Sequence, residues 1–258
     1  MSVDNNQTSK AFPYSSFMPF YFNGLAISND ATTPNTKLDI AAGSCLDSTG
    51  TFQMTLAAPV VINGASNGLN GLDTGSLVLS TVYAVYLVSD PVTQLATGAM
   101  ISTSLTGPLM PFGYSAWSLI GYIATDASVH FLKGYWKDND SASRLFLFDA
   151  PQATAVTAGA ATGYTGVALT KWVPAVPNLE VIINTSFVPA AASRVLDLQG
   201  GNATGDQVVI TGQVAAVVVT SQKLLMSQLV TGVPTINYKV SNADSNVAVN
   251  VAGYRFDL

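Results

Sequence analysis

Short runs of β-branched and aromatic residues, separated by turn-forming residues, are the feature of this sequence that most constrains its fold. Gly, Asn, Asp, Ser and Pro interrupt these runs along the whole chain, as in half-buried strands joined by turns. No long segment has the apolar spacing of an amphipathic helix, and good helix formers other than alanine are sparse. The sequence therefore predicts an all-β protein of the β-sandwich or jelly-roll type.

A polar, turn-rich stretch at residues 138–140 divides the 258-residue chain into two parts. Each part is long enough to bury a core, so we expect two jelly-roll-like β-sandwich domains, at residues 23–145 and 146–258. The last two expected strands alternate apolar and polar residues on either side of residues 242–246, which predicts a hairpin there. The strands are expected at residues 24–28, 37–41, 53–56, 59–62, 77–89, 96–102, 118–125, 128–132, 167–173, 179–187, 194–198, 206–219, 221–229, 235–241 and 247–256.

An extended N-terminal arm is expected at residues 1–22. Its first part is polar, and its second part is rich in aromatic residues and contains two prolines. So short a segment cannot form a core of its own, and we expect its aromatic side chains to dock on a neighbouring subunit. The candidate docking residues are Phe12, Tyr14, Phe17, Phe20, Tyr21 and Phe22.

Charged residues are unusually few in this chain. They make up 10% of it, against about a quarter in an average domain, so identical copies repel one another little. We therefore expect a homo-oligomer that buries much of its surface. The formal net charge of −5 and the scattered basic residues argue against a nucleic-acid partner, which requires clustered Lys and Arg.

The cysteine content and the N-terminal composition bear on the compartment. Cys45 is the single cysteine, so no intrachain disulfide can form, which fits folding in a reducing compartment. Residues 1–20 lack the basic and apolar regions of a signal peptide. No apolar run approaches the roughly 18 residues that cross a bilayer. We expect a soluble chain with no membrane partner.

Residues 73–76 read Asp-Thr-Gly-Ser, the spelling of the catalytic loop of an aspartic protease. That chemistry needs two carboxylates that share a proton. The chain has no second such loop, so only a symmetric dimer using Asp73 would supply both. A Gly- and Asn-rich loop precedes the motif, where the protease has a buried apolar strand. We favour a plain turn, in which Asp73 accepts backbone N–H groups and Gly75 adopts a positive φ.

Residues 64–68 match the Gly-x-Ser-x-Gly nucleophile elbow, and a triad of Ser66, Asp90 or Asp126, and His130 can be drawn. The elbow joins a strand to a helix, whereas a loop with no helical pattern follows residue 68. His130 lies in a short apolar run and is expected to be a strand residue. We therefore expect no catalytic residue and no enzyme.

Metal binding has little support in the sequence. Asp138 and Asp140 form an Asp-x-Asp pair, but Ser143 stands where the EF-hand loop requires glycine. His130 is the only histidine, and it has no cysteine or glutamate partners for a zinc site. We expect neither a metal nor a cofactor.

Several aromatic residues lie outside the obvious strand cores. Aromatic rings stack on sugar rings, which makes Trp136 and Trp172 candidate glycan contacts. The alternative, which we favour, places such residues in sandwich cores or subunit interfaces, where Trp and Tyr are enriched. The set comprises Tyr114, Trp117, Tyr135, Trp136, Tyr164 and Trp172.

Several segments resemble a family of tailed-bacteriophage virion proteins, often described as tail-fibre-like or structural. Residues 24–29 and 39–43 are similar to the family's Gly-Leu-x-x-Ser-Asn opening and Asp-Ile-Ala-x-Gly strand. Residues 72–75 and 83–88 are similar to its Leu-Asp-Thr-Gly turn and the Tyr-rich strand that follows, and the ending NYKVSNADSNVAVNVAGYRF resembles its closing β-domain. The resemblance covers residues 23–150 and, more loosely, 165–258. Residues 116–118 read Ala-Trp-Ser, where the family usually has a charged dipeptide, often two arginines.

The resemblance implies a non-enzymatic virion component that is assembled in the host cytoplasm. It would be a compact oligomeric β-sandwich, most plausibly a trimer, docked on the head or tail surface as a decoration, adaptor or short fibre component. The aromatic arm would contact a capsid or tail protein. A receptor-binding tail module that recognises a host surface glycan is the alternative, and a dimeric aspartic protease using Asp73 is the remote one.

Overall fold

The computed structural model describes residues 22–92, 96–137, 143–153, 156, 159–201, 207–228 and 233–257. These residues form strands, turns and loops, which confirms the expected all-β class for the described part of the chain. Nothing in this part is a helix long and apolar enough to cross a membrane. Residues outside the described ranges include Phe12, Tyr14, Phe17, Phe20 and Tyr21 of the expected arm, and Asp138 and Asp140.

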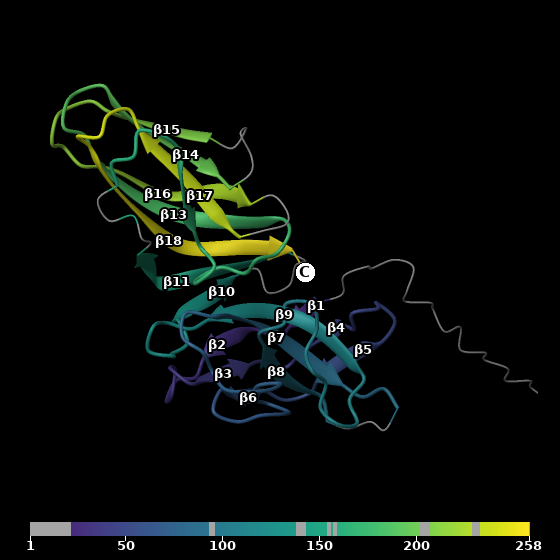
Figure 1. The fold of residues 1–258 in the computed structure, drawn as a ribbon. Helices are drawn as coiled ribbons and strands as arrows, with labels where there is room; N and C mark the ends of the chain where they lie inside the picture. Colours follow the sequence, from purple (N-terminus) through teal and green to yellow (C-terminus); the bar gives the residue numbers. More distant parts are fainter. Residues whose placement is uncertain are drawn as a thin grey trace, which may run out of the picture.

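The described strands form four sheets in which every pairing is antiparallel (Figure 1). Their orders are β1-β4-β5, β8-β7-β9, β12-β17-β14-β15 and the long β16-β13-β18-β11-β10-β2-β3-β6. The strands are β1 (Phe22–Gly24), β2 (Ile27–Asn29), β3 (Lys37–Ile40), β4 (Gly43–Leu46), β5 (Gln53–Leu56), β6 (Val60–Asn63), β7 (Val82–Ser89), β8 (Gly98–Ser102), β9 (Ala116–Ala124), β10 (Gly134–Lys137), β11 (Ser143–Ala153), β12 (Thr165–Ala168), β13 (Leu179–Val188), β14 (Arg194–Gly200), β15 (Gln207–Gly212), β16 (Val219–Gln228), β17 (Thr235–Val240) and β18 (Asn246–Asp257).

The eight-stranded sheet joins the two parts of the chain. Figure 1 shows β1 to β9 grouped together and β13 to β18 grouped above them, with β10 and β11 where the groups meet. β10 pairs with β11 from Gly134↔Phe148 to Lys137↔Leu145, and β11 pairs in turn with β18. The expected boundary between residues 145 and 146 falls inside β11. The division into two domains stays a prediction.

Strand alternation explains which side chains reach the core. In β17 every second residue is buried, with Ile236 and Val240 inside. The same two-residue period runs through most of β18, where Val247, Val249 and Val251 are buried. Successive side chains of a strand point to opposite faces, so one face of β17 and β18 contributes to the hydrophobic core, whereas β7 and β8 are buried at successive positions and contribute both faces.

The expected hairpin around residues 242–246 is wrong. β17 pairs with β12 and β14, whereas β18 pairs with β11 and β13, so the turn connects two sheets. Arg194 fixes this corner, because its guanidinium donates to Asn242 Oδ1 at 2.8 Å and to Asp244 Oδ2 at 2.7 Å. Alternation with a polar turn looks the same in sequence whether the two strands pair with each other or with others.

Residues 128–132 form no strand, so the expectation for His130 is also wrong. The backbone turns here because the Asp126 carboxylate accepts the backbone N–H groups of Ser128 at 2.7 Å and His130 at 2.8 Å. Val129 adopts a positive φ of 64° inside the turn. A side chain that binds backbone donors locally competes with strand pairing.

A buried cluster of aromatic rings fills the region where the two parts of the chain meet. Trp136 lies 4.9 Å from Phe146 and 5.8 Å from Phe256, measured between ring centroids. The Tyr254 hydroxyl donates to the carbonyl of Tyr122 at 3.0 Å, which ties β18 to β9. Each such ring pair contributes about 0.5–1.5 kcal/mol beyond the burial of its area.

Candidate functional site

Asp73, the predicted protease-like residue, connects two loops. Its Oδ2 atom accepts the Ser102 hydroxyl at 2.6 Å and the backbone N–H of Leu109 at 3.0 Å. Gly75 has a φ of 76°, as expected for the turn. The turn interpretation is thus supported with one difference: the backbone donor comes from 36 positions along the chain rather than from the turn itself.

We expect Asp73→Ala to lower the free energy of unfolding by about 1–3 kcal/mol, because two donors lose a charged acceptor. Urea denaturation followed by fluorescence measures this change. Ser76→Ala, at an exposed position in the same turn, is the control and should stay within about 0.5 kcal/mol of the parent chain. Equal stability of the two variants would show that Asp73 does not hold these loops.

Ser66 lies in a loop that lacks the geometry of a nucleophile elbow. Residues 64–72 form turns and an isolated bridge between Asn67 and Leu72, with no helix in this described segment. The Ser66 hydroxyl donates to the carbonyl of Asn63 at 3.0 Å. The loop closes on itself, since the N–H of Leu72 donates to the Ser66 carbonyl at 2.8 Å.

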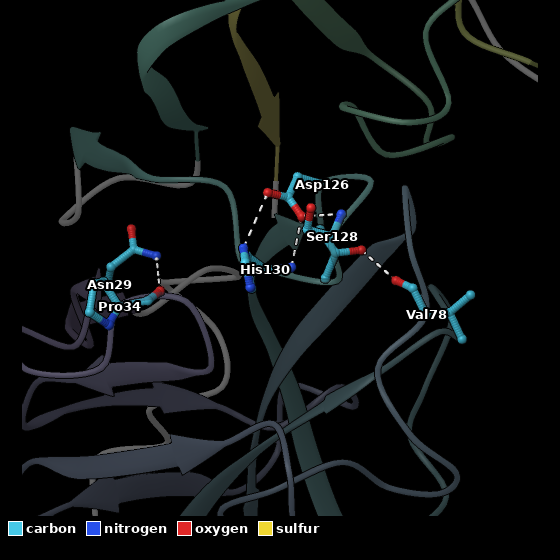
Figure 2. A network of polar contacts seen from close by, with 7 residues as sticks. Asn29, Pro34, Val78, Asp126, Ser128 and His130 are labelled. Carbon is cyan, nitrogen blue, oxygen red and sulfur yellow. Dashed lines mark hydrogen bonds and ion pairs between the residues drawn. The ribbon is translucent and has the colours of Figure 1, made fainter.

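Asp126 and His130 of the drawn triad do lie together, as Figure 2 shows. The His130 Nδ1 atom is 3.6 Å from Asp126 Oδ2, and both side chains are well exposed. The neighbouring Thr125 hydroxyl donates to the carbonyl of Val78. These contacts close the turn between β9 and β10 and hold it against the loop before β7.

The predicted glycan contacts differ in their placement. Trp136 is 8% exposed, and its ring is surrounded by the aromatic cluster, so it has no open face on which a sugar could stack. Trp172 is partly buried against the core, and its assignment stays a prediction. Of the other aromatic residues named from the sequence, Tyr135 and Tyr164 are the exposed ones, at 47% and 41%.

Phe22, the last residue of the expected arm, lies over a buried arginine. The guanidinium carbon of Arg144 is 4.3 Å from the Phe22 ring centroid and 5.6 Å from that of Trp136. Arg144 is fully buried and donates to the carbonyls of Ile120 and Leu25. Phe22 therefore packs on the core of its own chain and stays partly exposed, and its expected docking on a neighbouring subunit stays a prediction.

Cys45 lies near this arginine in the core. Burial raises the pKa of its thiol to about 11, although the Ser118 hydroxyl and the Arg144 charge act in the opposite direction. A thiol that stays protonated at neutral pH is a poor nucleophile and a poor metal ligand. The described ranges contain no group of three or more His, Cys, Asp and Glu side chains placed to hold a metal ion.

A second polar network, which the sequence did not reveal, lies on the four-stranded sheet. We call it the Tyr164 cluster, and it comprises Tyr164, Asp197, Gln199, Gln207 and Lys239. The Tyr164 hydroxyl donates to Asp197 Oδ2 at 2.6 Å and accepts from Gln199 at 2.8 Å. Gln207 donates to the same Asp197 oxygen at 2.6 Å, and the Lys239 ammonium lies 3.2 Å from it.

Electrostatics in the Tyr164 cluster follow from these contacts. Partial burial and the hydrogen bond to Asp197 raise the pKa of the Tyr164 hydroxyl, which stays protonated and can donate. Hydrogen bonds to Tyr164 and Asp197 raise the pKa of Lys239, which stays charged. The cluster therefore holds one carboxylate and one ammonium, with no net charge.

Comparison with known proteins identifies no family for this chain. No family model and no curated protein matches it. Two solved structures align with 92% of this chain. One is that of the infectious bursal disease virus Gx strain, at 11% identity, a TM-score of 0.20 and 70% coverage of that chain. The other is that of a Bacillus thuringiensis Cry1Da tryptic core variant, at 9% identity, a TM-score of 0.18 and 51% coverage of that chain. Both TM-scores are too low to show a shared fold.

Proposed function

We propose that this chain is a non-enzymatic structural component of a bacteriophage virion. In this proposal it forms two jelly-roll-like β-sandwiches, assembles as a trimer and docks on the head or tail as a decoration, adaptor or short fibre component. The sequence resemblance points to this class. The contacts of Asp73 and Asp126 are consistent with it, because both carboxylates bind donors that hold loops in place.

The observation that carries the proposal is the apolar character of the exposed loops. Phe112 is fully exposed and Leu109 is 65% exposed on the loop that Asp73 holds. Val217 and Val218 are each 53% exposed on the loop before β16. Few charges are present in the chain to keep copies apart. Contiguous exposed apolar patches mark interaction surfaces, and in this proposal the side chains of these loops form such patches and contact other subunits.

Two measurements test the proposal. Mass spectrometry of purified particles of the encoding phage should detect the chain as a stoichiometric component. Sedimentation equilibrium of the purified protein should give three times the 26.8 kDa of one chain, and Phe112→Ser should shift the equilibrium toward monomer by removing an apolar contact. Absence from the particles would overturn the virion assignment, and a monomer at micromolar concentration would overturn the trimer.

The arm is tested separately. Phe17→Ser combined with Phe20→Ser should abolish incorporation into particles while leaving the oligomer intact, because docking depends on burial of aromatic rings. Phe22 is left unchanged in this variant, since it packs on Arg144. Normal incorporation of the double variant would exclude the arm as the docking element.

A further inference from the structure

The outer face of the sheet β12-β17-β14-β15 carries an organised set of polar side chains. Leu196 and Leu198 of β14 point into the core, so Asp197 and Gln199 occupy the opposite face. The register places Asp197 directly beside Lys239 of β17 and Val209 of β15. Gln199 is likewise opposite Gln207. The backbone itself therefore sets the spacing of these groups.

Tyr164, just before β12, adds an aromatic ring to this face. The Lys239 ammonium lies 4.2 Å from the ring centroid and covers part of the ring. The residue is nevertheless 41% exposed, so the rest of the ring is open to solvent. Its orientation is restricted, since its hydroxyl is engaged by Asp197 and Gln199. A ring held in one orientation loses little entropy when a ligand stacks on it.

The Asp197 carboxylate shows an imbalance between its two oxygen atoms. Oδ2 interacts with Tyr164, Gln207 and Lys239. Oδ1 is buried and accepts no hydrogen bond from the described residues, and the residue as a whole is 5% exposed. A buried acceptor without a donor is costly. Gln207, which is exposed on the edge strand β15, donates to the other oxygen of the same carboxylate, so its amide lies beside the unsatisfied acceptor.

We propose that the Tyr164 cluster is a binding site for a neutral saccharide. The C–H groups on one face of a pyranose carry partial positive charge and would pack on the open part of the Tyr164 ring. Sugar hydroxyls would donate to Asp197 Oδ1 and accept from the amide of Gln207. A few placed polar groups beside an aromatic surface are the usual means by which a site orients a small polar ligand.

The charge of the cluster selects among ligand classes. Asp197 and Lys239 form an ion pair at 3.2 Å, so the site attracts neither anions nor cations strongly. The positive charge of the ammonium, 3.2 Å from Oδ2, would also repel a metal ion at this oxygen. A nucleic acid would require several basic groups, whereas this face supplies one. The inference goes beyond the proposed structural role and does not depend on it.

Saturation-transfer-difference NMR with the purified full-length chain tests the proposal. The probes are methyl α-glucopyranoside, methyl α-galactopyranoside, methyl α-mannopyranoside and N-acetylglucosamine, with N-acetylneuraminic acid as the anionic comparison. We expect at least one neutral sugar to bind with millimolar affinity. Tyr164→Ala should weaken that binding about tenfold or more, through loss of the stacked ring. Gln207→Ala should weaken it by about threefold through loss of a hydrogen bond.

Tyr135 provides a matched control. It is 47% exposed on β10 and also has a lysine, Lys137, near its ring at 5.9 Å, but no amide or carboxylate side chain among the described residues hydrogen-bonds to its hydroxyl. Tyr135→Ala should leave saccharide binding unchanged. Binding that is lost equally in both tyrosine variants, or confined to N-acetylneuraminic acid, or absent for all four neutral sugars, would overturn the proposal. None of these results bears on whether the chain is present in virions.

Discussion

Replacing Arg144 with alanine is expected to lower the free energy of unfolding by about 3–5 kcal/mol, the range for removing one partner of a buried charged contact. Arg144 is the largest fully buried side chain among the described residues. Its guanidinium stacks near the ring of Phe22. Alanine would leave a cavity there, and it would leave buried carbonyl groups without their donor.

The geometry of β9 explains why an arginine is needed at this position. The pairing of β9 with β7 shifts register, so that Leu119 and Gly121 face consecutive residues and Ile120 is the extra residue of a β-bulge. The extra residue of a bulge is left out of the ladder. Arg144 donates to the carbonyl of Ile120 and also to that of Leu25, at 3.3 Å. One side chain thus satisfies backbone groups from two segments far apart in sequence.

Urea denaturation at neutral pH measures the effect, with two further variants for comparison. Arg255→Ala removes an arginine whose side chain is 41% exposed on β18 and lies 3.7 Å from Glu180, and it should cost less than about 1 kcal/mol. Arg144→Met keeps most of the volume, so its loss of stability reports the lost polar and cation–π contacts of the guanidinium without a large cavity. If Arg144→Ala were no more destabilising than Arg255→Ala, the arginine would not be what holds this junction together.

Gly253→Ala is expected to cost about 3 kcal/mol or more, or to prevent folding, because there is no space for a methyl group. A Cβ atom at this position would lie 2.2 Å from the carbonyl oxygen of Phe146 and 2.8 Å from Leu147 Cδ2. The first obstacle is backbone of the paired strand β11, so no rotamer change can remove it. Separating β18 from β11 would disrupt the sheet that joins the two parts of the chain.

Gly163→Ala is the matched control for this prediction. A Cβ atom at Gly163 would have no neighbour within 4 Å, and its φ is not in the left-handed region. This substitution should be neutral or stabilising by up to about 1 kcal/mol, because alanine restricts the unfolded chain. The yield of soluble protein and the urea midpoint, measured for both variants, test the expected difference in stability. Equal midpoints would mean that β11 can move away from Gly253 without loss.

Local patterns in the sequence predicted several strands well. Residues 53–56 were predicted as a strand and form β5, and the prediction at residues 179–187 differs from β13 by one residue. The short strands β4 and β10 were missed, since Gly43, Ser44 and Gly134 resemble turn residues in sequence. Tertiary pairing overrides a weak local preference of this kind.

The strand expected at residues 206–219 shows the opposite error. β15 ends at Gly212, and the apolar residues that follow lie in a turn and remain exposed, Val217 and Val218 among them. An apolar run predicts that its side chains are buried, but it does not indicate whether they are covered by the same chain or by another one. If the proposed oligomer forms, a second copy would cover these side chains.

The sequence by itself determined the all-β class, the low charge and the position of many strands, because periodicity and turn chemistry act over a few residues. Only the tertiary structure decided which strands pair, since an alternating strand fits any partner of the same period. It also decided that Arg144 is buried and that the residues of the Tyr164 cluster meet. These residues are separated by up to 75 positions, from Tyr164 to Lys239. Contacts at such distances depend on sheet order and register, which no local pattern encodes.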